Sequence, residues 1–179
     1  EDIDIVVSSL AIKSGSITVS RPEGKKGRLN VYVANTFEIT GGAKIIFDGR
    51  QEGNGRAINI YYKGTKKITL GNGVSLYGLL HVDQAEIEMT GGSNGTLTII
   101  TEGPKVTIWN GANVTLDMIY APNTPVTLTS GGHVKGSIIS KSLLIENGST
   151  LTYKPLSTDF DEWTGGSSDK TTYKLGNWH

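Results

Sequence analysis

Glycine recurs at an interval of twenty residues along the middle of this chain, at Gly71, Gly91, Gly111 and Gly131. Asn or a second Gly stands beside each of them, and a stretch rich in Val, Ile, Leu and Thr follows. Gly and Asn accept the positive φ of a sharp corner, whereas β-branched residues resist it. A repeat this short cannot bury its apolar side chains by itself, so neighbouring repeats must stack. The interval therefore predicts a β-solenoid with rungs of about 20 residues.

Within the rungs, apolar and polar residues alternate as they do in a strand with one buried face. Charged residues set the phase, because an unpaired charge is costly to bury, and Asp117, Lys135 and Lys141 are expected to point outward. The positions expected to point inward are Val74, Val114, Val134, Leu80, Ile100, Tyr120, Val106, Ile108, Val126 and Leu128. The positions expected to point outward are Ser75, Thr115, His81, Thr101, Thr107, Thr127 and Thr129.

This phasing leaves an apolar ladder on the outside, formed by Leu79, Ile99, Ile119 and Ile139. Contiguous exposed apolar patches are uncommon on soluble monomers, so the ladder needs an explanation. Another segment covers it, or it is a binding face, or the phase slips by one residue and these side chains point inward. The pattern leaves all three alternatives open.

The chain is expected to form one domain in two parts. Residues 1–155 are predicted to form the β-solenoid, irregular over 1–69 with loops at Arg21–Arg28 and Asp48–Arg56, and regular over 70–155. Residues 156–179 have no period and include the large aromatic residues Phe160, Trp163, Tyr173 and Trp178. This tail is expected to cap the solenoid or cover the apolar ladder, because an uncapped end exposes strand edges and core. An aromatic contact surface is the alternative.

Charge and cysteine content exclude several classes of function. Seventeen Lys and Arg balance seventeen Asp and Glu, so no overall field attracts nucleic acid or an anionic membrane. The absence of cysteine removes disulfides, thiolate chemistry and cysteine metal sites. The sequence shows no signal peptide or membrane span and opens in a strand at Glu1–Ile5. We expect a piece of a longer protein with its targeting segment upstream, and no direct membrane insertion by this segment.

The acidic residues are too scattered to predict an enzyme. Hydrolysis of a polysaccharide needs two carboxylates facing each other across a groove, and the outward pair Glu86 and Glu88 has no second pair in the matching columns. The densest acidic cluster is a weak calcium candidate without the spacing of a known loop, and consists of Asp159, Asp161 and Glu162. The three histidines are far apart. No catalytic residue, cofactor or firm metal site is therefore predicted.

One segment resembles a known family. It contains Tyr120-Ala121-Pro122-Asn123, a short strand, a Gly turn, the run Gly136-Ser137-Ile138-Ile139, and a last strand ending in Tyr153. This order is similar to a C-terminal domain of bacterial prepilin-like proteins, which are secreted and associated with type IV pilus loci. The resemblance covers about residues 70–179 and implies a right-handed parallel β-helix outside the cell or on its surface. Pro122, which lacks an amide donor, is expected to end its strand.

Tapirins, which are cellulose-adhering proteins, are an analogy of architecture alone. The function favoured by these observations is non-catalytic surface adhesion to an extended polysaccharide such as cellulose. The candidate binding residues are Trp109, Tyr77, Tyr61, Tyr62, Trp163 and Trp178. The alternative is a pilus-tip or cell-envelope spacer that self-assembles through its ends, with pilus or envelope components as partners. A polysaccharide lyase or hydrolase is a third interpretation, which lacks a site.

Overall fold

The computed structural model describes residues 1–20, 27–48, 57–71, 73–91 and 96–154. Within these ranges the chain forms strands and no helix, which confirms the all-β class. No helix in this part of the chain is long and apolar enough to cross a membrane. The strands are β1 (Ile3–Lys13), β2 (Ser16–Ser20), β3 (Leu29–Thr40), β4 (Lys44–Asp48), β5 (Ile58–Tyr62), β6 (Ile68–Leu70), β7 (Ser75–Leu76), β8 (Gly78–Val82), β9 (Ile87–Met89), β10 (Thr96–Thr101), β11 (Val106–Ile108), β12 (Asn113–Leu128), β13 (His133–Ile145) and β14 (Thr150–Tyr153).

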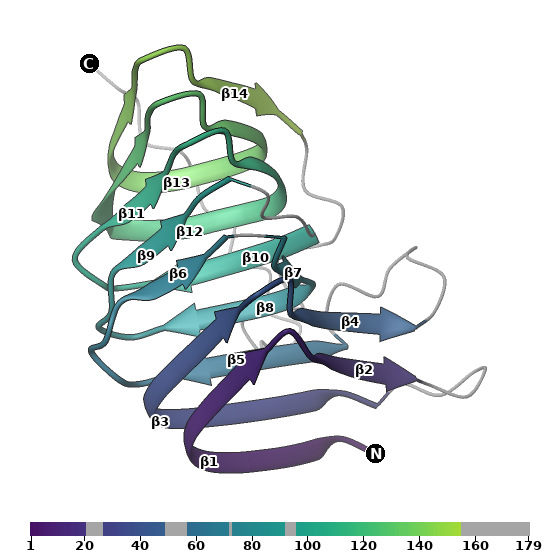
Figure 1. Cartoon of the computed structure of the whole chain (residues 1–179). Coiled ribbons are helices and arrows are strands. Elements are labelled where there is room, and N and C mark those ends of the chain that lie inside the picture. Colours follow the sequence, from purple (N-terminus) through teal and green to yellow (C-terminus); the bar gives the residue numbers. More distant parts are fainter. Residues whose placement is uncertain (21–26, 49–56, 72, 92–95, 155–179) are drawn as a thin grey trace, which may run out of the picture.

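The described strands pair in parallel throughout and make two sheets. An eleven-stranded sheet runs β1-β3-β5-β8-β10-β12-β11-β9-β6, with β13 and β14 continuing from β12, and β2, β4 and β7 form a second sheet of three strands. Figure 1 shows that the large sheet is curled, with the strands stacked in layers from the N-terminus to β14. The same face of each strand therefore turns toward one interior.

Register partners lie about one repeat apart in the middle of the chain. Ile60 pairs with Leu80, Leu80 with Ile99, Ile99 with Ile119, and Ile119 with Ile138, so successive partners are separated by 20, 19, 20 and 19 residues. We call such a run of register partners a column. The first part of the chain has wider intervals, for example 29 residues from Val31 to Ile60.

The core is made of inward columns of aliphatic side chains. The column of Val31, Ile60, Leu80, Ile99 and Ile119 is at most 3% exposed. Several inward positions predicted from the alternation are confirmed, since Val74, Val114, Val134, Val106, Ile108, Val126 and Leu128 are all buried. The corners are also as predicted: Gly111 and Gly131 have φ of 70° and 75°. Each follows a residue that itself has a positive φ, Asn110 or Ser130.

The predicted outer apolar ladder is not formed. Ile99 and Ile119 are 0% exposed in the core, whereas Ile139 is 47% exposed, so a constant spacing of twenty does not follow one column. The cause is the 19-residue step from Leu80 to Ile99, which shifts the phase by one residue. The one-residue slip is thus the correct alternative. It also reverses three further expectations, because Ile100 and Tyr120 lie outside and Thr101 lies inside.

Two local expectations in β12 are wrong as well. Asp117 is only 8% exposed, because the pairing of β10 with β12 jumps from Leu116 to Met118 and leaves Asp117 in a bulge beside Lys154. Pro122 does not end its strand, since β12 runs on to Leu128. The proline is accommodated because the pairing with β13 is interrupted between Ala121 and Pro125.

Candidate functional site

An outward column of aromatic and apolar side chains crosses the large sheet. Its register partners, one from each successive strand from β1 to β13, are Val6, Tyr32, Tyr61, His81, Ile100, Tyr120 and Ile139. We call this set the aromatic column. The four rings in it are half-buried, so part of each remains accessible from outside. A row of this kind runs perpendicular to the strands along the stacking direction.

The first three rings of the aromatic column are in contact with one another. Tyr32 and Tyr61 are stacked, with ring centroids 4.9 Å apart and planes 11° from parallel. Tyr61 meets the edge of His81 at a centroid distance of 5.9 Å and an angle of 68°. Burial, followed by the neighbouring Tyr32, raises the pKa of the Tyr61 hydroxyl. Tyr61 is therefore a neutral ring held in a fixed orientation.

Hydrogen-bonded amides flank the column on one side. The side-chain amide of Asn59 donates to Asn30 Oδ1 at 2.8 Å, and the amide of Asn30 donates to Asp4 Oδ1 at 2.8 Å. Farther along this flank, Thr98 and Met118 are each 1% exposed. Met118 lies outside the main hydrophobic cluster. This flank therefore presents polar groups near β1 and β3, whereas its residues on β10 and β12 are buried.

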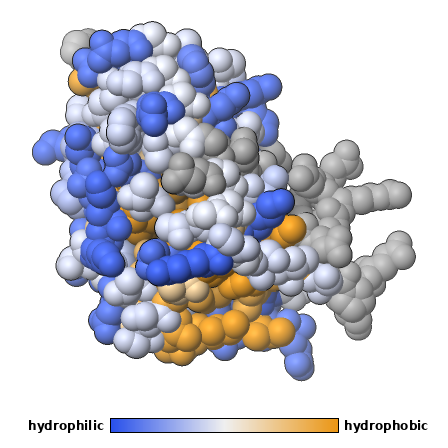
Figure 2. Space-filling view, in the orientation of Figure 1, coloured by the Kyte–Doolittle hydropathy of each residue, from blue (hydrophilic) through white to orange (hydrophobic). Residues whose placement is uncertain are grey.

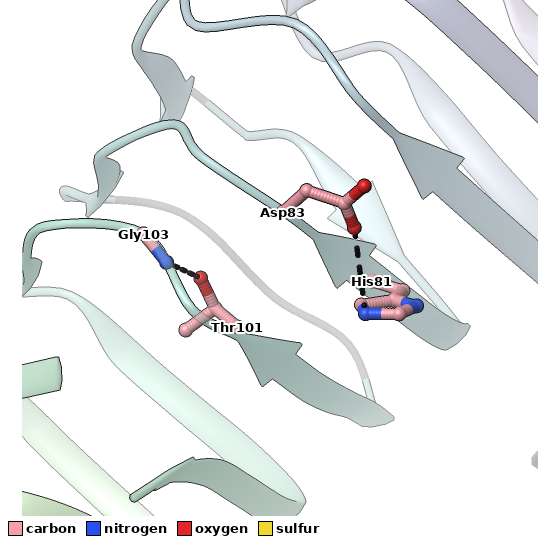
Figure 3. A network of polar contacts seen from close by, with 4 residues as sticks. All are labelled: His81, Asp83, Thr101 and Gly103. Carbon is pink, nitrogen blue, oxygen red and sulfur yellow. Dashed lines mark hydrogen bonds and ion pairs between the residues drawn. The ribbon is translucent and has the colours of Figure 1, made fainter. Parts of the chain in front are cut away.

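The other flank carries charged side chains. Asp83 Oδ1 lies 3.6 Å from Nε2 of His81, and Figure 3 shows the carboxylate turned toward the imidazole. On the next strand the amide of Gly103 donates to Thr101 Oγ1 at 2.9 Å, which satisfies the hydroxyl of that buried residue. Glu102 and Lys63 are exposed on the same side. Polar groups capable of contacting hydroxyls therefore border the rings on both sides.

The predicted binding residues do not form one site. Tyr61 belongs to the aromatic column, but its neighbour Tyr62 is 0% exposed and lies in the core. The hydroxyl of Tyr62 lies 3.1 Å from the carbonyl oxygens of both Asn35 and Lys66, so its polar end is satisfied internally. Tyr77 is half-buried at the junction of β7 and β8, where its amide donates to the carbonyl of Ile45.

Trp109 stands at the end of β11, and its neighbours are charged. The carboxylate of Glu88 lies 2.6 Å from Nζ of Lys67, and this hydrogen bond is the main cause that lowers the pKa of Glu88. The Trp109 indole also contributes to that lowering. The indole nitrogen of Trp109 is buried and has no aligned hydrogen-bond partner among the described residues. Trp109 follows β11, a strand that contributes no residue to the aromatic column.

The remaining predicted candidates lie outside the described residues. These are Trp163, Trp178, Asp159, Asp161 and Glu162. Within the described ranges, no group of three or more His, Asp or Glu side chains is placed to hold a metal ion.

Sequence reasoning missed Tyr32 and assigned Tyr120 to the interior. The 20-residue repeat does not connect Tyr32 with Tyr61, because these two register partners are 29 residues apart. Tyr120 was misassigned through the same one-residue slip that affected Ile100. Comparisons of the chain with family models, curated proteins and solved structures gave no match.

Proposed function

We propose that this chain is a non-catalytic adhesion module that binds an extended polysaccharide, such as cellulose, along the aromatic column. The observation that carries the proposal is the continuity of the column, with one residue from each strand and stacked rings at Tyr32 and Tyr61. Because Tyr32 and Tyr61 stack on each other, a ligand lying along the column would meet the outer edges of their rings and their hydroxyl groups. Contacts of this kind need little net charge, in keeping with the balanced composition.

The spacing of the column suits a repeating ligand. Neighbouring strands of a sheet lie about 4.8 Å apart, which is close to the length of one sugar unit in a β-1,4-linked glucan. A chain lying along the column would meet a similar surface at each strand. The half-buried side chains of Asn30 on one side and Asp83 on the other are placed to contact its hydroxyls.

We propose that the curled sheet is a right-handed parallel β-helix with rungs of about 20 residues in its regular part, as the intervals of 19 and 20 between register partners favour. The resemblance of residues 70–179 to prepilin-like proteins favours display at the cell surface. The predicted cap, residues 156–179, lies outside the described residues.

Binding to insoluble cellulose at high salt tests the function. We expect the wild-type chain to sediment with cellulose, and the double variant Tyr32→Ala/Tyr61→Ala to bind at least about tenfold more weakly, since a buried hot-spot ring typically costs more than about 1 kcal/mol when truncated. Tyr77→Ala is the matched control, because Tyr77 lies outside the aromatic column, and it should bind as the wild type does.

Melting curves of all three proteins show whether the double variant keeps its fold. Undiminished binding by a folded Tyr32→Ala/Tyr61→Ala protein contradicts the proposal. Equal losses in the double variant and in Tyr77→Ala also contradict it, because they place the binding surface elsewhere.

A further inference from the structure

β1 is the first strand of the stack, and part of its apolar surface is exposed. Ile3 is 63% exposed, Val6 77% and Ile5 40%. Figure 2 shows a hydrophobic area at the end of the molecule where β1 lies. Val31 and Ile60, which follow Ile5 in its column, are at most 3% exposed. A strand added beside β1 would therefore bury Ile5 as β3 and β5 bury the residues after it.

The backbone of β1 has one free side among the described residues. The strand is eleven residues long, contains no proline and pairs only with β3 among the described strands. Its pairing with β3 is interrupted between Val7 and Ser9, and Figure 1 shows β1 turning a corner about midway along its length. A long edge strand with apolar side chains is a template for pairing with another strand. That partner must follow the same corner.

Two hydrogen bonds show which polar groups of β1 face its free side. The amide of Ile3 donates to the carbonyl of Arg28 at 2.7 Å, and the amide of Ser14 donates to the carbonyl of Thr40 at 3.0 Å. Both acceptors lie on the side of β3. The direction of the backbone groups alternates from one residue to the next along a strand. The residues that direct both amide and carbonyl to the free side are therefore Asp4, Val6, Ala11 and Lys13.

β1 is complementary to itself when two copies pair in opposite directions. A two-fold axis that bisects the corner exchanges the two halves of the strand, so the bend of one copy follows the bend of the other. We consider the register that places Ser8 of one copy opposite Ser9 of the second copy. The remaining pairs are then Asp4 with Lys13, Ile5 with Ile12, Val6 with Ala11, and Val7 with Leu10.

The backbone groups agree with this register. In an antiparallel pair, two opposite residues either both form the hydrogen bonds between the strands or both face away from the partner. Asp4 and Lys13 both direct amide and carbonyl to the free side, and so do Val6 and Ala11. The residues between them direct these groups toward β3. The two copies can therefore pair without breaking a hydrogen bond to β3.

The same register keeps the two faces of the sheet together. Ile5 and Val7 before the corner, and Leu10 and Ile12 after it, are register partners of buried residues of β3 and so point inward. Each of these residues lies opposite another of the four. Val6 and the residue opposite it are both exposed on the outer face. The inner face of one copy is therefore continuous with the inner face of the other.

Opposite charges meet at both ends of the paired strands. Asp4 and Lys13 are the charged residues of β1, and both are exposed. Within one copy, Nζ of Lys13 lies 3.5 Å from the Glu38 carboxylate, and the amide of Asn30 donates to Asp4 Oδ1 at 2.8 Å. The second copy brings its Asp4 beside Lys13, so the lysine lies between two carboxylates. Charge thus favours this register at two symmetric places.

We propose that the chain forms a two-fold dimer in which β1 of one copy pairs antiparallel with β1 of a second copy in this register. Both copies use the same surface, so the contact closes at two copies and does not continue into a fibre. The proposal is independent of the proposed adhesion, because it uses the backbone edge of β1 and not the length of the aromatic column.

Sedimentation of the chain over a wide concentration range tests the proposal. We expect the wild-type mass to rise from that of a monomer to that of a dimer and no further. Asp4→Lys and Lys13→Glu should each weaken dimerisation by about tenfold, because each places like charges at both ends of the contact. Lys135→Glu is the matched control, since it makes the same change on an exposed residue of β13, and it should dimerise as the wild type does.

Mixing the two charge variants gives the sharpest readout. Asp4→Lys leaves positive charges at both ends of β1, and Lys13→Glu leaves negative charges at both ends. A contact between one copy of each variant joins opposite charges at both places. An equal mixture should therefore form a dimer of one copy of each, with about the affinity of the wild-type dimer.

A proline tests the backbone pairing separately from the charges. The amide of Val6 faces the free side, so Val6→Pro removes a donor that β3 does not use, and a proline at such an edge position is compatible with the folded single chain. We expect Val6→Pro to stay monomeric at concentrations at which the wild type is a dimer. Val6→Ala keeps the amide and should weaken dimerisation less. Melting curves show whether each variant keeps its fold.

Four results would overturn the proposal. The first is a wild-type chain that stays monomeric at every concentration, and the second is a mass that keeps rising beyond that of a dimer. The third is a mixture of the two charge variants that dimerises no more than either variant alone. The fourth is a loss of dimer in Lys135→Glu equal to that in Lys13→Glu, because it would mean that β1 is not the contact.

Discussion

The same columns of side chains run through the middle of the stack and its two ends. Side chains in the middle are more completely buried than side chains at the ends. Leu80 and Ile99 are 0% exposed, whereas Ile5, in the same column, is 40% exposed. All three are aliphatic residues pointing inward from a parallel strand. Among the described strands, a middle residue has a strand on each side and Ile5 has one. Burial in this molecule is therefore supplied by the neighbouring strands.

The largest effect should come from truncating one column residue in the middle. We expect Leu80→Ala to lower the free energy of unfolding by about 2–5 kcal/mol, because it leaves a cavity between packed strands. Ile5→Ala, in the same column, should cost less than about 1 kcal/mol, since part of that side chain is already in water. Urea unfolding of both variants measures the difference. Equal losses would contradict the contrast between middle and end.

A pair of glycines sharpens the same contrast in the backbone. Gly78 and Gly148 both have positive φ, of 112° and 74°. A Cβ on Gly78 would collide with the carbonyl of Ile58 on the adjacent strand, whereas a Cβ on Gly148, in the turn before β14, meets nothing within 4 Å. We expect Gly78→Ala to cost about 2–4 kcal/mol through strain and overpacking, and Gly148→Ala about 1 kcal/mol through strain alone.

Thermal unfolding of the two alanine variants checks this prediction, with the wild type in the same scan. A Gly148→Ala variant as unstable as Gly78→Ala would mean that the positive φ, and not the neighbouring strand, sets the cost.

The smallest expected effect concerns two ion pairs. In the middle, Lys67 holds the Glu88 carboxylate at 2.6 Å and lowers its pKa. At the N-terminal end, Lys13 and Glu38 are 3.5 Å apart and both more exposed. A lowered carboxyl pKa adds stability that is present above the unfolded value of about 4.5 and is lost as the pH falls through the folded value. We therefore expect Glu88→Gln to lower the melting temperature at neutral pH and to lose this effect in acid.

Glu38→Gln is the matched control and should change the melting temperature less than Glu88→Gln at neutral pH. Melting temperatures of the three proteins between neutral pH and pH values below about 4 provide the measurement. A Glu88→Gln effect that grows on acidification has the wrong sign for a lowered pKa and would contradict the assignment.

The regular part of the fold was predictable because its corners and its inward residues have distinct chemistry. Gly111 and Gly131 adopt the positive φ that their repeat predicted, and Val74, Val114 and Val134 are buried as expected. These positions are constrained locally, by backbone sterics and by alternation with polar residues.

The phase of β10 was not predictable, because both of its faces carry apolar residues. Ile99 and Ile100 are adjacent, and either could point inward. The choice depends on the 19-residue step from β8, and alternation alone does not reveal a step one residue shorter than the repeat. The same limit applies to the candidate site. Tyr61 was identified as one of an adjacent pair, but its stacking on Tyr32 depends on the lengths of the intervening loops.

Amide hydrogen exchange tests the central claim most directly, because it reports the opening of each strand separately. In dilute protein we expect the amides of β8 and β10 to exchange orders of magnitude more slowly than those of β1 and β14. Equal protection of β1 and β8 would contradict the account that the neighbouring strands supply burial and protection.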